Sequence, residues 1–198
     1  GTAGGSTADS NVAVGHKALQ VITTSDDNVA IGANAGGNIT TGNSNVLVGF
    51  SAGMVVGGGY GLTTSGLNTA VGFESLGASS ANAITTLSGL ASTTGLKNVA
   101  VGYNSLGALL GGDENVAVGS GALVAMAGDA DTDTVNNGFR NIAIGADAMG
   151  AVNAGSHNTA TTDDNIAIGN DALLGASFGS SDLDLVGNIA IGSQALYA

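Results

Sequence analysis

One short motif, an asparagine followed by three apolar or small residues and then a glycine, occurs nine times in this chain. The first and third residues after the asparagine are Val or Ile, apart from Thr69, and the second is Ala, apart from Leu47. The seventh residue after the asparagine is Ala or Ser in every copy. The copies begin at Asn11, Asn28, Asn45, Asn68, Asn98, Asn115, Asn141, Asn165 and Asn188. A fixed motif at this frequency indicates a repeat architecture, in which each copy is one structural unit.

The spacing of the copies separates a fixed unit from variable insertions. Consecutive asparagines lie 17 to 30 residues apart, so 17 residues is the smallest unit and longer copies carry insertions after the motif. These insertions, such as 57–67 and 79–96, are rich in Gly, Ser, Thr and Asn, which is typical of surface loops on a solenoid. We therefore predict a flexible lead-in over residues 1–10 and one continuous repeat array over 11–198, with a rung beginning at each asparagine.

Each motif predicts a short β-strand. The run 29–31 is β-branched at its outer positions and is closed by Gly32, which favours a strand over a helix. A 17-residue unit leaves room for a corner, a second and weaker strand such as 19–23, and a return corner. Stacked units predict an all-β chain, a parallel β-solenoid of nine rungs that is about 43 Å long at about 4.8 Å per rung.

Side chains alternate along a strand, so the motif has two faces. We expect Val29, Ile31 and their equivalents to fill the core of the chain. Ala30 and its equivalents would then form the opposite face, which a second copy of the chain can approach closely. Gly32 is expected at a tight corner, where glycine accepts a positive φ without steric cost. Asn28 is expected to stack on its equivalents in a ladder or to bond the corner backbone.

Three copies represent these expected structural positions. They are Asn28, Ala30, Gly32, Asn98, Ala100, Gly102, Asn165, Ala167 and Gly169.

Composition narrows the possible partners. The 198 residues include 15 acidic and only three basic side chains other than histidine, for a formal net charge of −12. Nucleic-acid binding needs a basic stripe, so no nucleic-acid partner is expected, and an anionic membrane surface is disfavoured for the same reason. No apolar run approaches the roughly 20 residues of a transmembrane helix, so no membrane insertion is expected. The lack of cysteine excludes disulfides and thiolate metal sites. Because the sequence opens on Gly1, we expect it to be a piece of a longer protein.

Acidic pairs precede three of the asparagines, at 26–27, 113–114 and 163–164. Two carboxylates can act as an acid and a base, or they can hold Ca²⁺. However, Asp is also favoured at corners, and adjacent side chains in an extended chain point apart. We interpret these pairs as corner and solubility residues.

A weak calcium candidate lies in an acidic insertion. Asp129, Asp131 and Asp133 occupy the alternating positions of an EF-hand loop. The pattern then fails, because Thr134 stands where the bend needs glycine and Arg140 stands where a bidentate Glu should close the site. A looser calcium site is left open, and no other cofactor is expected.

No residue pattern predicts an enzyme. His16 and His157 are the only histidines, and no cysteine accompanies them as a nucleophile. His16 occupies the position after the motif glycine, which varies from copy to copy and is therefore expected to face outward. The glycine-rich run 57–61 lacks the lysine of a phosphate-binding loop.

The motif resembles two families of fibrous proteins. It is similar to the left-handed parallel β-roll repeat in the heads of trimeric autotransporter (YadA-like) adhesins. It resembles still more closely the "NTAVGxxAL" arrays of phage tail fibres, on the stretches 68–77, 98–107 and 165–175. The resemblance covers the whole chain and implies a homotrimer, intertwined or side by side, with small residues on the threefold axis. The long insertions depart from the adhesin pattern and favour the phage type.

The resemblance implies a structural or adhesive fibre module, a rigid trimeric rod of a phage tail or capsid fibre on the virion surface. Its surface loops would contact a host cell-surface receptor or glycan. The alternative is the head of an adhesin on a bacterial cell surface. An ice-binding solenoid is less favoured because the Thr clusters form no regular ladder. A glycan-degrading tailspike is less favoured because no Trp, three Tyr and four Phe offer few surfaces for sugar stacking.

Overall fold

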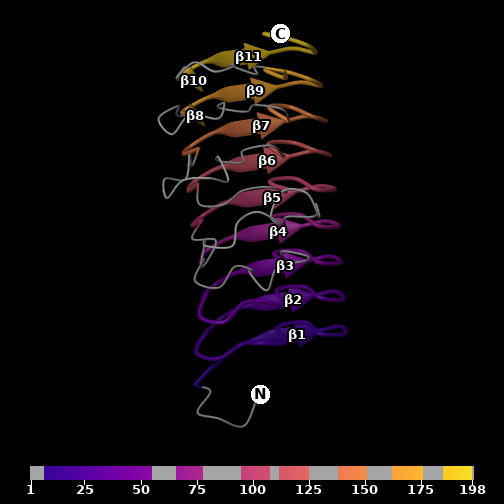
Figure 1. Ribbon diagram of the computed structural model, residues 1–198, viewed down its shortest axis with the longest axis vertical. Coiled ribbons are helices and arrows are strands. Elements are labelled where there is room, and N and C mark those ends of the chain that lie inside the picture. The colour runs from indigo at the N-terminus through magenta and orange to yellow at the C-terminus, as the bar shows by residue number, and fades with distance from the viewer. Residues whose placement is uncertain are drawn as a thin grey trace, which may run out of the picture.

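The computed structural model describes residues 7–54, 66–77, 95–107, 112–124, 138–150, 162–175 and 185–197. Within these ranges the chain is all-β, and its strands are stacked one above another along the long axis, from β1 at the N-terminal end to β11 at the C-terminal end (Figure 1). This described part contains no helix long and apolar enough to cross a membrane. Residues 1–6 of the predicted lead-in lie outside the described residues.

Nine strands of three residues form one parallel sheet in chain order. They are β1 (Val12–Val14), β2 (Val29–Ile31), β3 (Val46–Val48), β4 (Thr69–Val71), β5 (Val99–Val101), β6 (Val116–Val118), β7 (Ile142–Ile144), β9 (Ile166–Ile168) and β11 (Ile189–Ile191). Each motif position pairs with the same position in the next copy, so that Ala30 pairs with Ala13 on one side and Leu47 on the other. The predicted parallel β-solenoid is confirmed. We number its rungs 1 to 9 from the asparagine that opens each.

A second, two-stranded parallel sheet joins rungs 8 and 9 just before their asparagines. Its strands are β8 (Thr162–Asp163) and β10 (Leu185–Val186), with Leu185 paired to Thr162. It extends the rung-to-rung hydrogen bonding of the main sheet at the corner where the chain enters each motif.

The two faces of the main sheet are the reverse of those predicted. Ala30 is fully buried, whereas Ile31 on the same strand is 41% exposed. The central residue is buried in the same way from β2 to β11. The prediction that Val and Ile fill the core was therefore wrong. A three-residue strand directs one side chain inward and two outward, and the narrow interior of a 17-residue rung accepts the smaller one.

Leucines from the opposite side of each rung complete the core. The eighth residue after the asparagine is a buried Leu or Met in six rungs. These residues are Leu19, Leu76, Leu106, Leu123, Met149 and Leu173. They pack with the strand alanines and with the small seventh residue, such as Ala35 or Ala122. From rung 4 to rung 8 the core is thus one large side chain and two small ones per rung.

The return half of the rung contains turns rather than a second strand. Residues 16–21 form turns, so the prediction of a strand at 19–23 was wrong. Instead, three residues of the first rung have left-handed backbone, Ser10 (φ 56°), Lys17 (φ 59°) and Leu19 (φ 48°), and their equivalents repeat this in later rungs. Left-handed backbone costs a non-glycine residue about 1–2 kcal/mol. It also directs the N–H of Leu19 to the carbonyl of Ala35 in the next rung, at 3.1 Å, which offsets that cost.

Candidate functional site

A continuous column of asparagine side chains runs through the interior of the solenoid. Asn28 Oδ1 accepts hydrogen bonds from both the backbone N–H and Nδ2 of Asn45, each at 2.9 Å. Asn28 Nδ2 in turn donates to Asn11 Oδ1 at 3.1 Å and to the carbonyl of Gly42, in the next turn of the chain, at 2.9 Å. A buried amide must be hydrogen-bonded, and here each one links its own rung to the rung before and the rung after.

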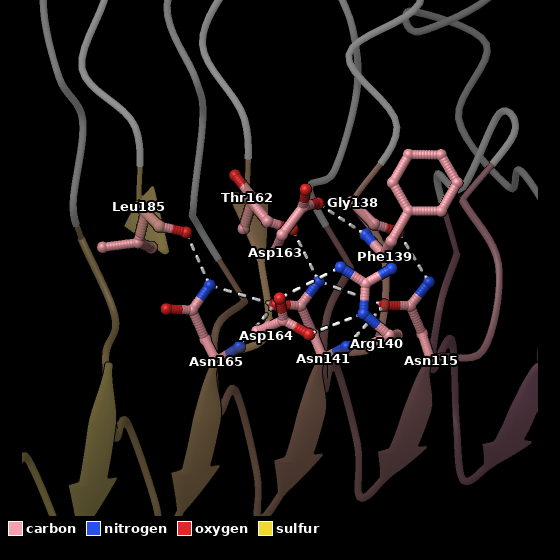
Figure 2. Close-up of polar contacts among 10 residues, drawn as sticks. All are labelled: Asn115, Gly138, Phe139, Arg140, Asn141, Thr162, Asp163, Asp164, Asn165 and Leu185. Carbon is pink, nitrogen blue, oxygen red and sulfur yellow. Dashed lines mark hydrogen bonds and ion pairs between the residues drawn. The ribbon is translucent and has the colours of Figure 1, made fainter. Parts of the chain in front are cut away.

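The column continues along the array. Asn98 Nδ2 donates to the carbonyl of Gly112 at 2.8 Å, and Asn98 Oδ1 accepts the N–H of Asn115 at 2.9 Å. Figure 2 shows the same pattern further along, where Asn165 Nδ2 donates to Asn141 Oδ1 at 3.0 Å and to the carbonyl of Leu185 at 2.7 Å. The requirement for a donor and an acceptor on one short side chain explains why asparagine stands in all nine copies.

The motif glycines form a second structural column. Gly32 has φ 135°, Gly102 has φ 137° and Gly169 has φ 135°, all in the region that favours glycine. A Cβ added to Gly102 would lie only 2.5 Å from the carbonyl oxygen of Gly119 in the next rung. Both the backbone conformation and the close stacking therefore exclude any side chain at this corner.

Each predicted acidic pair has one member that accepts a backbone hydrogen bond, and in two of the pairs the other member forms an ion pair. The first member binds backbone in the preceding rung. Asp26 Oδ1 accepts the N–H of Asp9 at 2.7 Å, and Asp113 Oδ1 accepts the N–H of Leu96 at 2.8 Å. Asp163 Oδ1 accepts the N–H of Phe139 in the same way at 2.9 Å (Figure 2). At the corner, these carboxylates accept the backbone N–H groups that would bond to a carbonyl of the next rung in a strand.

In two of the three pairs, 113–114 and 163–164, the second member forms an ion pair on the outside of the rod. Lys97 Nζ lies 2.9 Å from Glu114 Oε1, and Arg140 Nε lies 2.6 Å from Asp164 Oδ1. The hydrogen bond from Lys97 lowers the pKa of Glu114, and the hydrogen bond from Arg140 lowers the pKa of Asp164. The four side chains occupy the same position in four consecutive rungs and alternate in sign. This alternation was present in the sequence but is apparent only once the copies are aligned.

Because the two carboxylates of the pairs 113–114 and 163–164 bind different groups, these pairs do not form two-carboxylate sites. Within the described ranges, no group of three or more His, Asp or Glu side chains is placed to hold a metal ion. His16 is exposed. Asp129, Asp131, Asp133 and His157 lie outside the described residues, as does the glycine-rich run 57–61. The weak calcium candidate therefore stays a prediction.

Three aromatic rings form a stack on consecutive rungs. The ring centroids of Phe50 and Phe73 are 5.1 Å apart with an interplanar angle of 15°, and those of Phe73 and Tyr103 are 5.6 Å apart at 14°. The three residues are 45%, 45% and 58% exposed. All occupy the position after the motif glycine, which the sequence indicated to be outward-facing. That this position carries an aromatic residue in three successive rungs, 3 to 5, was not predicted from the sequence.

The outer face of the main sheet carries no charge. It consists of the first and third residues after each asparagine, which we call the Val/Ile face. Every member is Val or Ile except Thr69. The third residue after the asparagine is exposed in most rungs, as at Ile31 and Val101, whereas the first, as at Val99, is half-buried in most rungs. In a chain with a net charge of −12, an uncharged apolar face over nine rungs is the main candidate for a functional surface.

Comparison with protein-family models, curated proteins and solved structures gives no match to this chain. The functional argument therefore depends on the geometry of the repeat itself.

Proposed function

We propose that the chain is a non-enzymatic fibre module, a rigid rod that assembles with two further copies of itself into a left-handed β-roll homotrimer. The observation that carries this proposal is the Val/Ile face. At about 4.8 Å per rung and roughly 10 Å of width, this face covers about 400 Å². Exposed apolar patches beyond a few hundred Å² are uncommon on monomers and usually mark interaction sites.

The Val/Ile face replaces the alanine face as the surface for the partner copies. Ala100 and Ala167 are fully buried inside their own chain and are not available to a second backbone. The outward residues of the same strands, such as Val101 and Ile168, remain exposed. Copies arranged around an axis parallel to the rod would each turn this face inward and cover it.

The hydrogen bonding within one chain suits a stiff rod. Neighbouring rungs are joined at the sheet, at the asparagine column and at the return turns, as in the bonds from Val29 N–H to Asn45 O at 2.8 Å and from Gly36 N–H to Ala52 O at 2.9 Å. Bending would have to stretch all of these bonds on one side. A rod of this kind serves to hold something else at a distance from a surface.

The resemblance of the motif to phage tail-fibre arrays makes the virion surface the favoured location, with loops that contact a host receptor or glycan. The alternative location is a bacterial surface, as the head of a trimeric adhesin. Labelling the parent particle or cell with an antibody to this chain, followed by electron microscopy, distinguishes the two. Glycan depolymerisation and thermal hysteresis assays should both give no activity, since activity in the first would indicate a tailspike and activity in the second an ice-binding protein.

Native mass spectrometry tests the assembly directly. We expect the mass of a trimer for the unaltered chain. Val101→Glu and Ile144→Glu each place a charge on the Val/Ile face and should yield monomers. Gln20→Glu adds the same charge on the exposed return half of rung 1 and should leave the trimer intact. A monomer for the unaltered chain at micromolar concentration contradicts the proposal.

A further inference from the structure

The three stacked rings, Phe50, Phe73 and Tyr103, form what we call the aromatic ridge. The ridge borders the Val/Ile face, because Phe50 follows Val48 across the Gly49 corner and the same holds in the next two rungs. In these rungs an exposed aromatic side chain follows the two outer apolar residues of the strand, one residue beyond the corner glycine. Among the described residues, the ridge is therefore the largest change in side-chain size along this surface, the smaller changes being Thr69 and the replacement of Val by Ile at Ile31 and in rungs 7 to 9.

We propose that the aromatic ridge sets the axial register between copies of this chain. The occupant of the surface is a second copy, seated on the Val/Ile face and reaching the ridge at its border. This inference rests on the proposed homotrimer and adds to it the feature that decides how far one copy is shifted along another.

The Val/Ile face alone selects a register poorly. Sliding one copy by one rung, about 4.8 Å, brings Val101 opposite Val71 or Val118 of its neighbour in place of Val101. The new contacts are chemically equivalent to the old ones, and only the contacts of the terminal rung are lost. Copies with this face alone would assemble at several offsets of similar free energy.

The ridge removes this degeneracy. The same position is Ala33 in the rung before the ridge and Ser120 in the rung after it. A shift of one rung would therefore place a terminal ring of one copy beside a small side chain of the next and leave that ring in water. Burying a large apolar side chain is worth about 1.5–3 kcal/mol, and the loss recurs at each interface of the assembly.

Two other features are less suited to the same role. The four charged side chains of alternating sign are paired within their own chain, Lys97 with Glu114 at 2.9 Å and Arg140 with Asp164 at 2.6 Å. Phe73 is stacked between Phe50 and Tyr103, so only one face of each terminal ring is left uncovered by another ring. The exposed ring edges fit apolar side chains of another copy better than a sugar, which stacks on a ring face.

The test measures the register in the whole chain. The sequence has no cysteine, so Gln20→Cys provides a single site for a spin label on the exposed return half of rung 1, away from the column of the ridge. Electron-electron resonance should give one narrow distance distribution between labels. Replacing the ridge by Phe50→Ser, Phe73→Ser and Tyr103→Ser introduces the residue found naturally at Ser120. This variant should stay trimeric, and its distribution should broaden into several distances separated by rung offsets.

A matched control removes apolar area without touching the ridge. Val48→Thr, Val71→Thr and Val101→Thr use the residue found naturally at Thr69 in the same face. This control should weaken assembly but keep the single narrow distribution. If the ridge variant keeps one narrow distribution as a trimer, the inference is wrong although the trimer stands. If the unaltered chain is a monomer by native mass, the proposed assembly fails first.

A second variant covers the case in which the serine variant does not assemble. Phe50→Ser with Ser120→Phe keeps three rings but moves the ridge one rung toward the C-terminus. Mixed with the unaltered chain, it should either sort into separate trimers or form mixed trimers offset by about 4.8 Å along the axis. Mixed trimers that keep the original label distance contradict the proposal. So does a ridge replacement that abolishes glycan binding but leaves the register unchanged.

Discussion

Leu47 reaches into the core volume that the missing side chain of Gly36 leaves empty, and the buried Ile39 fills another part of it. A Cβ added to Gly36 would lie 2.9 Å from Leu47 Cδ1, and also 2.9 Å from Leu19 Cδ2. Gly36 stands at the eighth position after its asparagine, where most rungs carry a buried Leu or Met, while Leu47 stands at the strand centre, where every other rung carries Ala. The large side chain of Leu47 on the strand of rung 3, together with Ile39 in the return half of rung 2, thus fills the place that a Leu or Met at the eighth position fills in other rungs.

This exchange leads to a double-mutant cycle. Leu47→Ala should lower the free energy of unfolding by about 2–5 kcal/mol, because it leaves a cavity at a fully buried site. Gly36→Leu alone should lower it by about 1–3 kcal/mol through overpacking. The two together should recover most of the loss, since Leu19 and Leu106 accept the same left-handed backbone at φ 48° and 50°. Urea denaturation measures all four chains, and strictly additive losses would show that the two sites do not share one volume.

The asparagine column should be sensitive to loss of a single nitrogen. Asn115→Asp keeps the size of the side chain but removes the Nδ2 that donates to Asn98 Oδ1 at 3.2 Å and to the Gly138 carbonyl at 2.8 Å. We expect a loss of about 2–4 kcal/mol, because a buried carbonyl loses its donor and a charge is buried beside an acceptor. Thermal unfolding near neutral pH checks this.

Asn188→Asp is the matched control for the column. Asn188 lies in the last rung and is only half-buried, although its Nδ2 makes the equivalent bond to Asn165 Oδ1 at 3.0 Å. Its replacement should cost clearly less than that of Asn115. Equal losses at the two sites would mean that burial of the column is not what makes it sensitive.

The strands and corners of the fold could be predicted from the sequence, but which face of each strand is buried could not. Val29–Ile31 and Gly32 encode a strand and a corner through their own backbone preferences, and the structure places both there. Alternation divides a strand into two faces but does not say which is inside when both are apolar. The larger side chains were assigned to the core by hydrophobicity, whereas the narrow rung, already filled by leucines such as Leu106, selected alanine.

The candidate surface was hidden for the same reason. Once Ile31 and its equivalents are assigned to the core, no apolar face is left outside to recognise. The turn at 16–21 was missed because Val21 and Ile22 favour a strand locally, while the left-handed residue Leu19 is held by its bond to Ala35 in another rung. The aromatic ridge and the alternating charges depend on which residues are neighbours in adjacent rungs. These neighbours become apparent only when the copies, which differ in length, are aligned.

The outer ion pairs should make a part of the stability depend on pH. The pKa of Glu114 is lowered from its ordinary value of 4.5 by the hydrogen bond from Lys97. A carboxyl whose pKa is lower in the folded than in the unfolded state stabilises the fold at pH values above its unfolded pKa. This contribution is lost as the pH falls through its folded pKa. Glu114→Gln should therefore lower the melting temperature slightly at pH 7, since the pair is exposed, and have no effect near pH 2. An equal difference at both pH values would contradict the assignment.

The strained corners offer a way to stabilise the chain. Leu67 is an exposed residue with φ 61°, a conformation that costs a β-carbon-bearing side chain about 1–2 kcal/mol but that Asn tolerates through its short polar side chain. Leu67→Asn should raise the free energy of unfolding by roughly 0.5–1 kcal/mol. Leu96→Asn provides the control, because Leu96 is also exposed and lies at a corner but is not among the residues with positive φ. Urea denaturation of the two variants should show a gain for the first alone, and an equal gain for both would point to the removal of exposed leucine rather than to relief of backbone strain.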